Sequence, residues 1–310
     1  MGRRTASEAR LPRAIARAVA LRPVARLGGG LAPDAVAIEE PLEIRVDGEP
    51  LATTMRTPGA DEDLALGFLL AEGIIGGARD VSAVVRCGRP DEPGFANVLD
   101  VRSGAGVRLD PDRLLEGTRR SPTTSACGVC GRASIDGLVA RLRPVDPGVR
   151  LDPALLGAAM DALARHQPVF AATGGVHGAV LLGPGGELLA AAEDVGRHNA
   201  VDKAVGALVR QGRVGAGASP GGPALLAVSG RAGFEIVQKA AAAGVPAVAS
   251  VSAPTTLAIA LADRLGMALA GFVRGDRYNV YAHAWRLGLA ARGGPEGDAA
   301  RCRSAALPPA

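Results

Sequence analysis

Short apolar runs that alternate with helical patterns dominate residues 224–273 and constrain the fold more than any other feature of the chain. The runs read ALLAV, PAVASV and MALAGFV, and the segments FEIVQKAAAAG and TTLAIALADRLG lie between them. Nearly continuous apolar strands joined by helices are typical of a sheet that is buried on both faces. The pattern therefore predicts an α/β protein with a largely parallel sheet.

The segments before this region predict further elements. PALLGAAMDALARH predicts a helix, VHGAVLLGPGGELLAAAED two strands around a Pro-Gly-Gly turn, and GRHNAVDKAVGALVRQG an amphipathic helix. Further upstream, apolar and charged residues alternate over 42–46 and lead into an Asp47-Gly48 hairpin signal. A helix that begins at the acidic run 61–63, with short strands near 80–88 and 96–103, would complete a small α+β domain.

The composition restricts the class of protein. Hydrophobic residues make up 48% of the 310 residues, yet no stretch approaches the ~20 apolar residues of a membrane-spanning helix. The net charge is only +4, and most of the basic excess lies in the N-terminal arginines, so we expect no nucleic-acid partner. Arg13, Arg17 and Arg22 interrupt any apolar core of a secretory signal. Four cysteines are too few for a secreted disulfide scaffold, and we expect a cytoplasmic chain with reduced thiols and no membrane association.

Polar residues follow each of the three apolar strands, where ligands bind in open α/β sheets. These residues are Gly230 and Arg231 after the first strand, Ser252, Thr255 and Thr256 after the second, and Arg274, Gly275, Asp276 and Arg277 after the third. Two of the three segments lead into helices, whose free N–H groups bind anions, and arginines suit bidentate contact with phosphate. A phosphate-bearing ligand is one interpretation. The other is that Ser252 and the threonines only cap a helix and that the arginines are solvated.

The segment EDVGRHNAVDK concentrates ionisable side chains: Glu193, Asp194, Arg197, His198, Asp202 and Lys203. His198 and Asp202 are four residues apart and would share one face of a helix. The segment is either a polar site at a helix N-terminus or an exposed helix end with ordinary salt bridges. His177, in the nearby TGGVHG, is equally compatible with a functional role and with a buried, hydrogen-bonded histidine.

Cys127 and Cys130 form a C-x-x-C pair in SACGVCGR, within a long Gly- and Arg-rich connection. A structural zinc site would need a second cysteine or histidine pair, and a zinc deaminase would need H-x-E with P-C-x-x-C. The sequence has neither, so we expect no intrinsic metal. A thioredoxin-like pair belongs at a strand-to-helix junction, which this connection does not match. Arg132 would favour the thiolate, so an exposed nucleophile that carries a group is the remaining interpretation.

Six ordered motifs together resemble the formate dehydrogenase accessory sulfurtransferase family (FdhD). They are TPGADEDLALGFLLAEGII, SACGVCG, TGGVHGA, EDVGRHNAVDK, SGRAGFEIVQKAAAAGVPAVASVSAPTTLAIALADRLG and GFVRGDRYNVYAH. They extend from about Leu42 to His283, and residues 1–30 and the tail after Arg292 lie outside them. Many relatives carry serine where this chain has Ala126; both cysteines of the motif are present.

The resemblance implies a persulfide carrier that takes sulfur from a cysteine desulfurase. The sulfur passes to the molybdenum or tungsten bis(guanine dinucleotide) cofactor of formate dehydrogenase. The expected protein partners are therefore the cysteine desulfurase and formate dehydrogenase. By this resemblance Cys127 would carry the persulfide and Cys130 would assist. The expected cofactor-binding residues are Phe272, Val273, Arg274, Gly275, Asp276 and Arg277, together with Arg231 and Ser252 from the strand ends.

The resemblance also implies a homodimer and a cytidine-deaminase-like, three-layer α/β domain. We expect a flexible arginine-rich N-terminus (1–30), a small α+β domain (31–120), a cysteine-bearing loop (121–135), the larger α/β domain (136–290) and a flexible tail (291–310). The alternative to a sulfurtransferase is a non-catalytic chaperone that binds the cofactor and formate dehydrogenase. Its cysteines would then hold zinc or make structural contacts.

Overall fold

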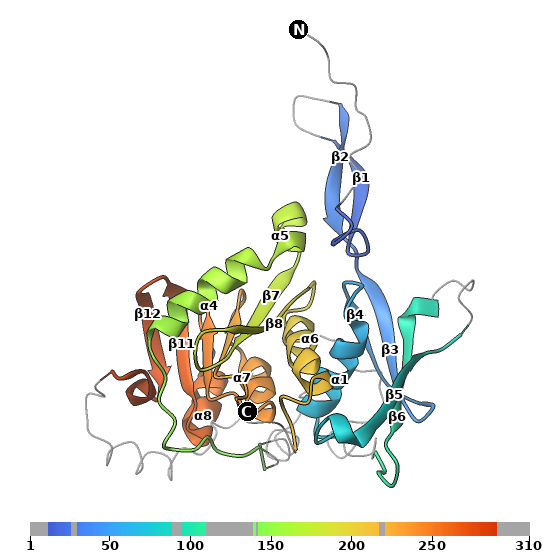
Figure 1. Ribbon diagram of the computed structural model, residues 1–310. Coiled ribbons are helices and arrows are strands. Elements are labelled where there is room, and N and C mark those ends of the chain that lie inside the picture. Colours follow the sequence, from blue (N-terminus) through green and yellow to red (C-terminus); the bar gives the residue numbers. More distant parts are fainter. Residues whose placement is uncertain are drawn as a thin grey trace.

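The computed structural model describes residues 12–25, 30–88, 95–109, 139–140, 142–216 and 221–289. Within these residues the chain forms a six-stranded sheet, a four-stranded sheet and a two-stranded hairpin (Figure 1). The hairpin consists of β1 (Val19–Ala25) and β2 (Leu31–Ala37). The four-stranded sheet contains β3 (Glu40–Val46), β4 (Glu49–Arg56), β5 (Val81–Arg86) and β6 (Val98–Ser103). The six-stranded sheet contains β7 (His177–Leu182), β8 (Leu188–Asp194), β9 (Leu225–Val228), β10 (Ala247–Ser250), β11 (Ala268–Arg274) and β12 (Arg277–Ala282).

The six-stranded sheet has the order β12-β11-β10-β9-β7-β8. Its centre is parallel, because β10 pairs in parallel with both β9 and β11. The parallel arrangement predicted for the three apolar runs is confirmed. The expectation that the sheet is largely parallel is wrong for the six-stranded sheet as a whole. The other pairs are antiparallel, since β7–β8 and β11–β12 are hairpins and β9 runs opposite to β7.

Helices cover both faces of this sheet. One face packs against α6 (Arg197–Arg210), α7 (Phe234–Ala242) and α8 (Thr256–Leu265), and the other against α4 (Ala154–Arg165). In β9, Leu226 and Val228 point toward the first group, whereas Leu225 and Ala227 point toward α4, as the two-residue period of a strand requires. The short helix α5 (Pro168–Thr173) follows α4 directly. The predicted three-layer α/β arrangement is confirmed, and the specific likeness to cytidine deaminases stays a prediction.

The four-stranded sheet has the order β4-β3-β6-β5 and packs on α1 (Asp61–Ala71). The β3–β4 turn lies at the predicted Asp47-Gly48, where both residues have positive φ values of 50° and 91°. These angles give the type I′ geometry that matches the twist of a two-residue hairpin. Three short 3₁₀ helices complete the described secondary structure: η1 (Ala78–Asp80), η2 (Phe95–Asn97) and η3 (Ala284–Leu287).

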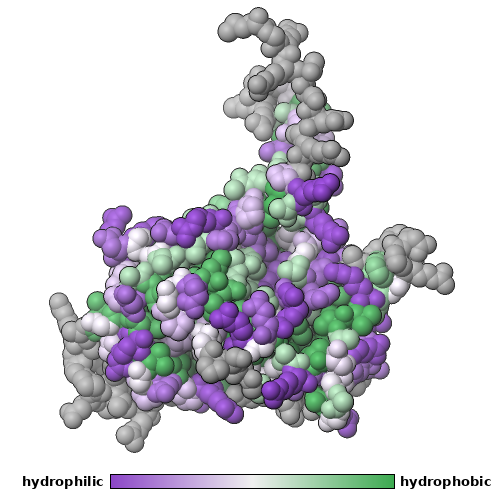
Figure 2. Space-filling model, in the orientation of Figure 1, coloured by the Kyte–Doolittle hydropathy of each residue, from purple (hydrophilic) through white to green (hydrophobic). Residues whose placement is uncertain are grey.

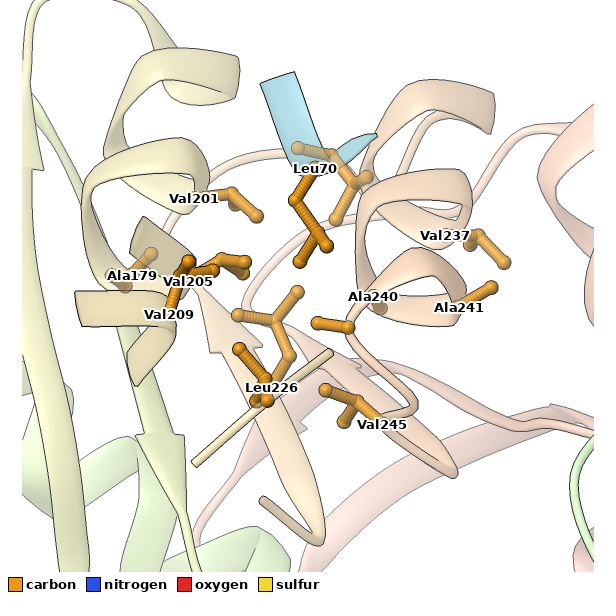
Figure 3. Close-up of a cluster of buried hydrophobic side chains, with 14 of the residues drawn as sticks. Leu70, Ala179, Val201, Val205, Val209, Leu226, Val237, Ala240, Ala241 and Val245 are labelled. Carbon is orange, nitrogen blue, oxygen red and sulfur yellow. The ribbon is translucent and has the colours of Figure 1, made fainter. Parts of the chain in front are cut away.

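Helices α1 and α6 cross at very close range and join the two sheets through a common core. A side chain at Gly67 would overlap the backbone of Asp202, and one at Gly206 would overlap the backbone of Asp63. Apolar side chains of α1, α6, α7 and the six-stranded sheet meet around Leu70 and Leu226 (Figure 3). Helix α6 is therefore enclosed, and ten of its fourteen residues are buried, more than the expected amphipathic pattern implies.

The expected flexible N-terminus of residues 1–30 is wrong for residues 19–25, which form β1 and pair with β2 over seven residue pairs. Ile15, Ala18 and Val19 at the base of the hairpin are buried against Val169 and Val176. The arginines that precede this strand obscured the apolar residues within it, and the strand itself contains only one arginine, Arg22. The hairpin projects from the rest of the molecule (Figure 1). The borders that we predicted at residues 120 and 135 lie outside the described residues.

Candidate functional site

The carboxyl ends of β9, β10 and β11 meet at one edge of the sheet, and backbone hydrogen bonds join the segments that follow them. The Ala232 N–H donates to the Ala253 carbonyl at 3.2 Å, which links the segments after β9 and β10. The Phe272 N–H donates to the Ser252 carbonyl at 3.1 Å, which links β11 to the segment after β10. The fold therefore brings the sequence-predicted residues Arg231, Ser252 and Phe272 to one edge.

The end of β11 is irregular. The register of β11 and β12 shifts between Gly271 and Arg274, and Phe272 has a φ of 54° with 47% of its surface exposed. An added side chain at Gly271 would lie 2.9 Å from Pro254 and 3.1 Å from the Ser252 carbonyl, so this position requires glycine. A bulge of this kind redirects side chains near a sheet edge. It turns Phe272 toward solvent and leaves Val273 buried.

Arginines supply the positive charge of this edge. Arg274 donates from Nη1 to the Val251 carbonyl at 2.6 Å and to its own neighbour's carbonyl, that of Val273, at 2.9 Å. Arg274 and Arg277 are paired across the β11–β12 turn. Neither these two nor Arg231 forms an ion pair with a carboxylate of the described residues. Three cations that have no counter-ion among the described residues favour an anionic ligand at this edge.

A cavity of about 590 Å³ opens beside the strand ends. Of the predicted ligand residues, Val273, Arg274 and Gly275 line it, whereas Phe272, Asp276, Arg277, Arg231 and Ser252 lie outside its lining. The rest of the lining comes from α4, α5 and the starts of the neighbouring segments: Met160, Asp161, Leu163, Ala164, Gln167, Phe170, Gly174, Gly175, Val176, His177, Ser229 and Val251. Its size is that of a site for a small organic ligand.

His177 lies on the cavity wall at the start of β7. Burial lowers the pKa of its imidazole, and the positive charges of Arg197 and His198 lower it further. The ring is therefore neutral at physiological pH and can both donate and accept a hydrogen bond. Beside it, the Gly178 N–H donates to the Ser229 hydroxyl at 2.9 Å, which holds the start of β7 against the end of β9.

Gln167 is a lining residue that the sequence analysis did not identify. Its Nε2 is buried and has no hydrogen-bond partner within the described part of the chain. Buried amide groups nearly always have a partner, and one that lacks it at a cavity wall is a candidate ligand contact. The signal in the sequence was weak, because Gln167 precedes Pro168 at the first position of a six-residue helix.

Several charged side chains of the polar segment EDVGRHNAVDK are buried and paired, so it is not an exposed helix end; its role as a polar site stays a prediction. Asp194 pairs with Lys203 at 2.7 Å, and both side chains are buried. Asp194 also accepts the Thr57 N–H at 3.1 Å, and Lys203 donates to the Thr57 carbonyl at 2.7 Å. Asn199 donates to the Met55 carbonyl at 2.7 Å. These contacts join the end of β4 to β8 and α6, so the segment links the four-stranded sheet to the larger one.

The same helix face forms two polar side-chain contacts with α7. His198 Nδ1 lies 2.9 Å from Glu235, and Lys239 donates to both oxygens of Asp202 at 2.7 and 2.8 Å. The spacing of four residues on each helix aligns the two pairs, as predicted for His198 and Asp202. Asp202 and Lys239 are buried, so their charges serve the packing of α6 against α7.

Cys127 and Cys130 lie outside the described residues. Of the residues that are described, no group of three His, Cys, Asp or Glu side chains could hold a metal ion. The same residues contain no helix that is both long and apolar enough to cross a lipid bilayer.

The fold and the site define an α/β protein with an arginine-rich edge and an open cavity at the carboxyl ends of its parallel strands. Residues 37–288 match the model of the FdhD/NarQ family, and the chain belongs to this family. It is 66% identical to the sulfur carrier protein FdhD of Anaeromyxobacter dehalogenans over 273 residues, which cover 88% of this chain and 94% of the relative.

Two further comparisons agree. The sulfur carrier protein FdhD of Mycobacterium tuberculosis is 48% identical over 262 residues, which cover 82% of this chain and 92% of the relative. The crystal structure of a protein described as a formate dehydrogenase accessory protein from Desulfotalea psychrophila superposes with a TM-score of 0.64 at 25% identity. The match covers 87% of this chain and 98% of that one. The family resemblance predicted from the six motifs is thus confirmed.

Proposed function

We propose that this chain is a sulfurtransferase that carries sulfur for formate dehydrogenase. The observation that carries the proposal is the 66% identity, over nearly the whole length of both chains, to a protein named as a sulfur carrier. The C-G-V-C-G run at residues 127–131 supplies thiols for this role. We place the reaction in the cytoplasm, where thiols remain reduced.

Cys127 is the proposed carrier. Its thiolate attacks the terminal sulfur of a persulfide on a cysteine desulfurase, so that a new S–S bond forms on Cys127 and the desulfurase cysteine leaves as a thiolate. Release follows when the Cys130 thiolate attacks the Cys127 sulfur. The terminal sulfur then leaves as hydrosulfide, and the two cysteines are oxidised to a disulfide that a cellular dithiol reduces.

The substrate that receives the sulfur is, in this proposal, the molybdenum or tungsten bis(guanine dinucleotide) cofactor of formate dehydrogenase. Four diphosphate-linked phosphates make it strongly anionic, which suits Arg231, Arg274 and Arg277 at the strand ends. The predicted residues Phe272, Val273, Gly275, Asp276 and Ser252 lie at the same edge, and three of the predicted set also line the cavity. The cofactor assignment rests on the resemblance and on this charge.

The sulfur-carrier role is tested by incubating the purified chain with a cysteine desulfurase and cysteine. Peptides are then mapped by mass spectrometry without reductant. We expect one additional sulfur atom on Cys127 and none on Cys87, which serves as the internal control. A Cys127 that stays unmodified beside an active desulfurase would contradict the proposal.

The division of labour between cysteines and arginines is tested separately. The Cys127→Ala variant is expected to lose formate dehydrogenase activation and to bind guanosine diphosphate, a fragment of the cofactor, as the parent chain does. The Arg274→Ala variant is expected to accept sulfur on Cys127 and to bind the nucleotide more weakly. Loss of nucleotide binding in the cysteine variant would favour the alternative, a cofactor-binding chaperone, as would stoichiometric zinc in the purified protein.

A further inference from the structure

The hairpin β1–β2 has one face that is apolar along its whole length. Directly opposite residues of an antiparallel pair share a face. One face therefore carries the pairs Val19–Ala37, Leu21–Ala35, Pro23–Pro33 and Ala25–Leu31. The pair nearest the body belongs to the buried cluster with Val169 and Val176. Toward the tip the cover ends, and Leu21 is 37% exposed while Leu31 is 75% exposed.

This exposed stretch differs from the scattered leucines of an ordinary surface. It continues a buried cluster without interruption, and it lies on a hairpin that projects from the body (Figures 1 and 2). A two-stranded hairpin is marginally stable in water unless its apolar face packs against something else. Among the described residues, only those at its base pack against this face, and Leu21 and Leu31 of the distal half are exposed.

The edges of the hairpin restrict how that molecule can bind. Pro23 lies directly opposite Pro33, and neither has a backbone N–H. The two prolines must form a non-hydrogen-bonded pair, in which the backbone nitrogens point outward along both edges. Both edges thus lack a donor near mid-strand, which disfavours the addition of another strand. A partner must pack on the apolar face.

The positive charge around the hairpin restricts the kind of partner that can bind to its apolar face. Residues 1–37 contain seven arginines and two acidic residues, whereas the remainder contains 28 basic and 29 acidic residues. Arg13, Arg17 and Arg22 are exposed around the hairpin. Two copies of the chain would bring these positive charges together, so a second copy is disfavoured. The described hairpin carries no aromatic side chain on which bases could stack, which disfavours a nucleic acid.

The hairpin also lies close to the candidate site. Val169 of α5 and Val176, which follows that helix, anchor its base, and α5 also contributes Phe170 to the cavity wall. A protein held on the hairpin would stand beside the cavity. The strands lie almost wholly before residue 37, where the match to the family model begins.

We propose that the apolar face of β1–β2 is a docking surface for formate dehydrogenase, through an apolar surface patch with an acidic rim. This inference rests on the proposed function for the identity of the partner. Leucines and prolines supply the apolar contact, and the surrounding arginines pair with the acidic rim and accelerate association.

The test measures binding of the full chain to purified formate dehydrogenase that lacks its cofactor, by calorimetry at about 50 and about 300 mM salt. The Leu21→Ser/Leu31→Ser variant is expected to bind at least about tenfold more weakly, because such anchors dominate interfaces. Leu188→Ser is the matched control, since Leu188 is 38% exposed on β8 of the body, and its affinity should stay within about twofold. Reversal of Arg13, Arg17 and Arg22 to glutamate should remove most of the salt dependence while the leucines remain.

Circular dichroism and thermal melting establish that each variant is folded. Unchanged binding of the double-serine variant overturns the proposal. The proposal is also overturned if light scattering shows a wild-type dimer that the double-serine variant no longer forms, because a second copy would then be the occupant. It is likewise overturned if the double-serine variant selectively loses binding to phosphatidylglycerol vesicles, because a lipid surface would then be the occupant. Sulfur loading of Cys127 is measured on the same proteins. If the wild-type chain does not load, the proposed function fails, while the binding comparison still decides the role of the hairpin.

Discussion

Replacing Gly206 by alanine tests the contact between α1 and α6 on which the joining of the two sheets depends. The new methyl group would overlap the Asp63 carbonyl oxygen and would lie 2.6 Å from its carbon and 2.8 Å from the Gly67 nitrogen. Comfortable contacts between such atoms need about 3.5 Å, and the overlap with the Asp63 carbonyl oxygen is the tightest, so the helices must separate by more than roughly 1 Å. No flexible side chain can absorb the shift, because every atom concerned belongs to a backbone.

A gap of that size removes about half or more of the dispersion energy across an interface. The overpacking cost in such cores is about 1–3 kcal/mol, and a backbone-to-backbone conflict belongs at or above the upper end. Alanine is also favoured over glycine inside a helix by about 1 kcal/mol, which opposes the loss only in part. We therefore expect Gly206→Ala to lower the free energy of unfolding by at least ~2 kcal/mol.

Urea unfolding followed by circular dichroism measures this loss. Gly157→Ala in α4 is the matched control, because the nearest atom to its methyl group would be the Gly275 carbonyl oxygen at 3.5 Å, an ordinary contact. The control should be more stable than the parent by about 0.5–1 kcal/mol. If Gly206→Ala proves as stable as Gly157→Ala, α1 and α6 do not cross at the distance described, and the reasoning is refuted.

Two further predictions concern ionisable side chains: the buried Asp202–Lys239 pair and the imidazole of His177. Lys239→Met leaves the Asp202 carboxylate buried without its partner and should cost about 3–5 kcal/mol of unfolding free energy in urea. The Asp202→Leu/Lys239→Met double variant should recover most of this unfolding free energy. If the single and the double variant lose the same amount, the two charges do not act as a pair. His177 has a pKa below its unfolded value of about 6.5, so the unfolded chain binds more protons and stability should fall as pH drops through 6.5 toward the folded pKa. His177→Asn should flatten this decline between pH 7.5 and 5, and an unchanged slope would show that other groups cause it.

The regular elements of the larger sheet were predictable because each has a clear local period. The apolar runs of β9, β10 and β11 and the Asp47-Gly48 turn carry their signals within a few residues. The hairpin β1–β2 was missed because the arginines that precede it set the character of the N-terminal segment, although Val19 and Leu21 already alternate with polar or small residues. Short α5 has six residues, too few for a helical period.

The site was predictable where strand order alone determines it. The ends of parallel strands must share one edge, so Arg231, Ser252 and Arg274 could be placed together in advance. The role of EDVGRHNAVDK could not be predicted, because its partners are remote in sequence. Lys239 lies 37 residues after Asp202, and Thr57 lies 137 residues before Asp194. Whether such a cluster is a site or an internal link depends on tertiary contacts that no local pattern encodes.

The buried polar groups of this molecule are of two kinds: those that bond to one another, and the side-chain amide of Gln167, which has no partner in the described chain. The groups of the β8–α6 link satisfy one another, whereas Gln167 lines the cavity and its buried Nε2 has no partner in the described chain. Burial of an unsatisfied amide costs about 1–3 kcal/mol, so Gln167→Met should raise the stability of the free protein by about 1 kcal/mol.

If the same amide contacts a ligand, that gain is accompanied by weaker binding. Guanosine diphosphate affinity, measured by calorimetry, should fall about five- to tenfold in Gln167→Met, the equivalent of one neutral hydrogen bond. Gln167→Asn, which keeps the amide but shortens its reach, separates the loss of the group from a change in packing. A variant that gains stability and binds the nucleotide unchanged would show that the amide faces the cavity without serving it, and the ligand would then have to depend on the arginines of the strand ends alone.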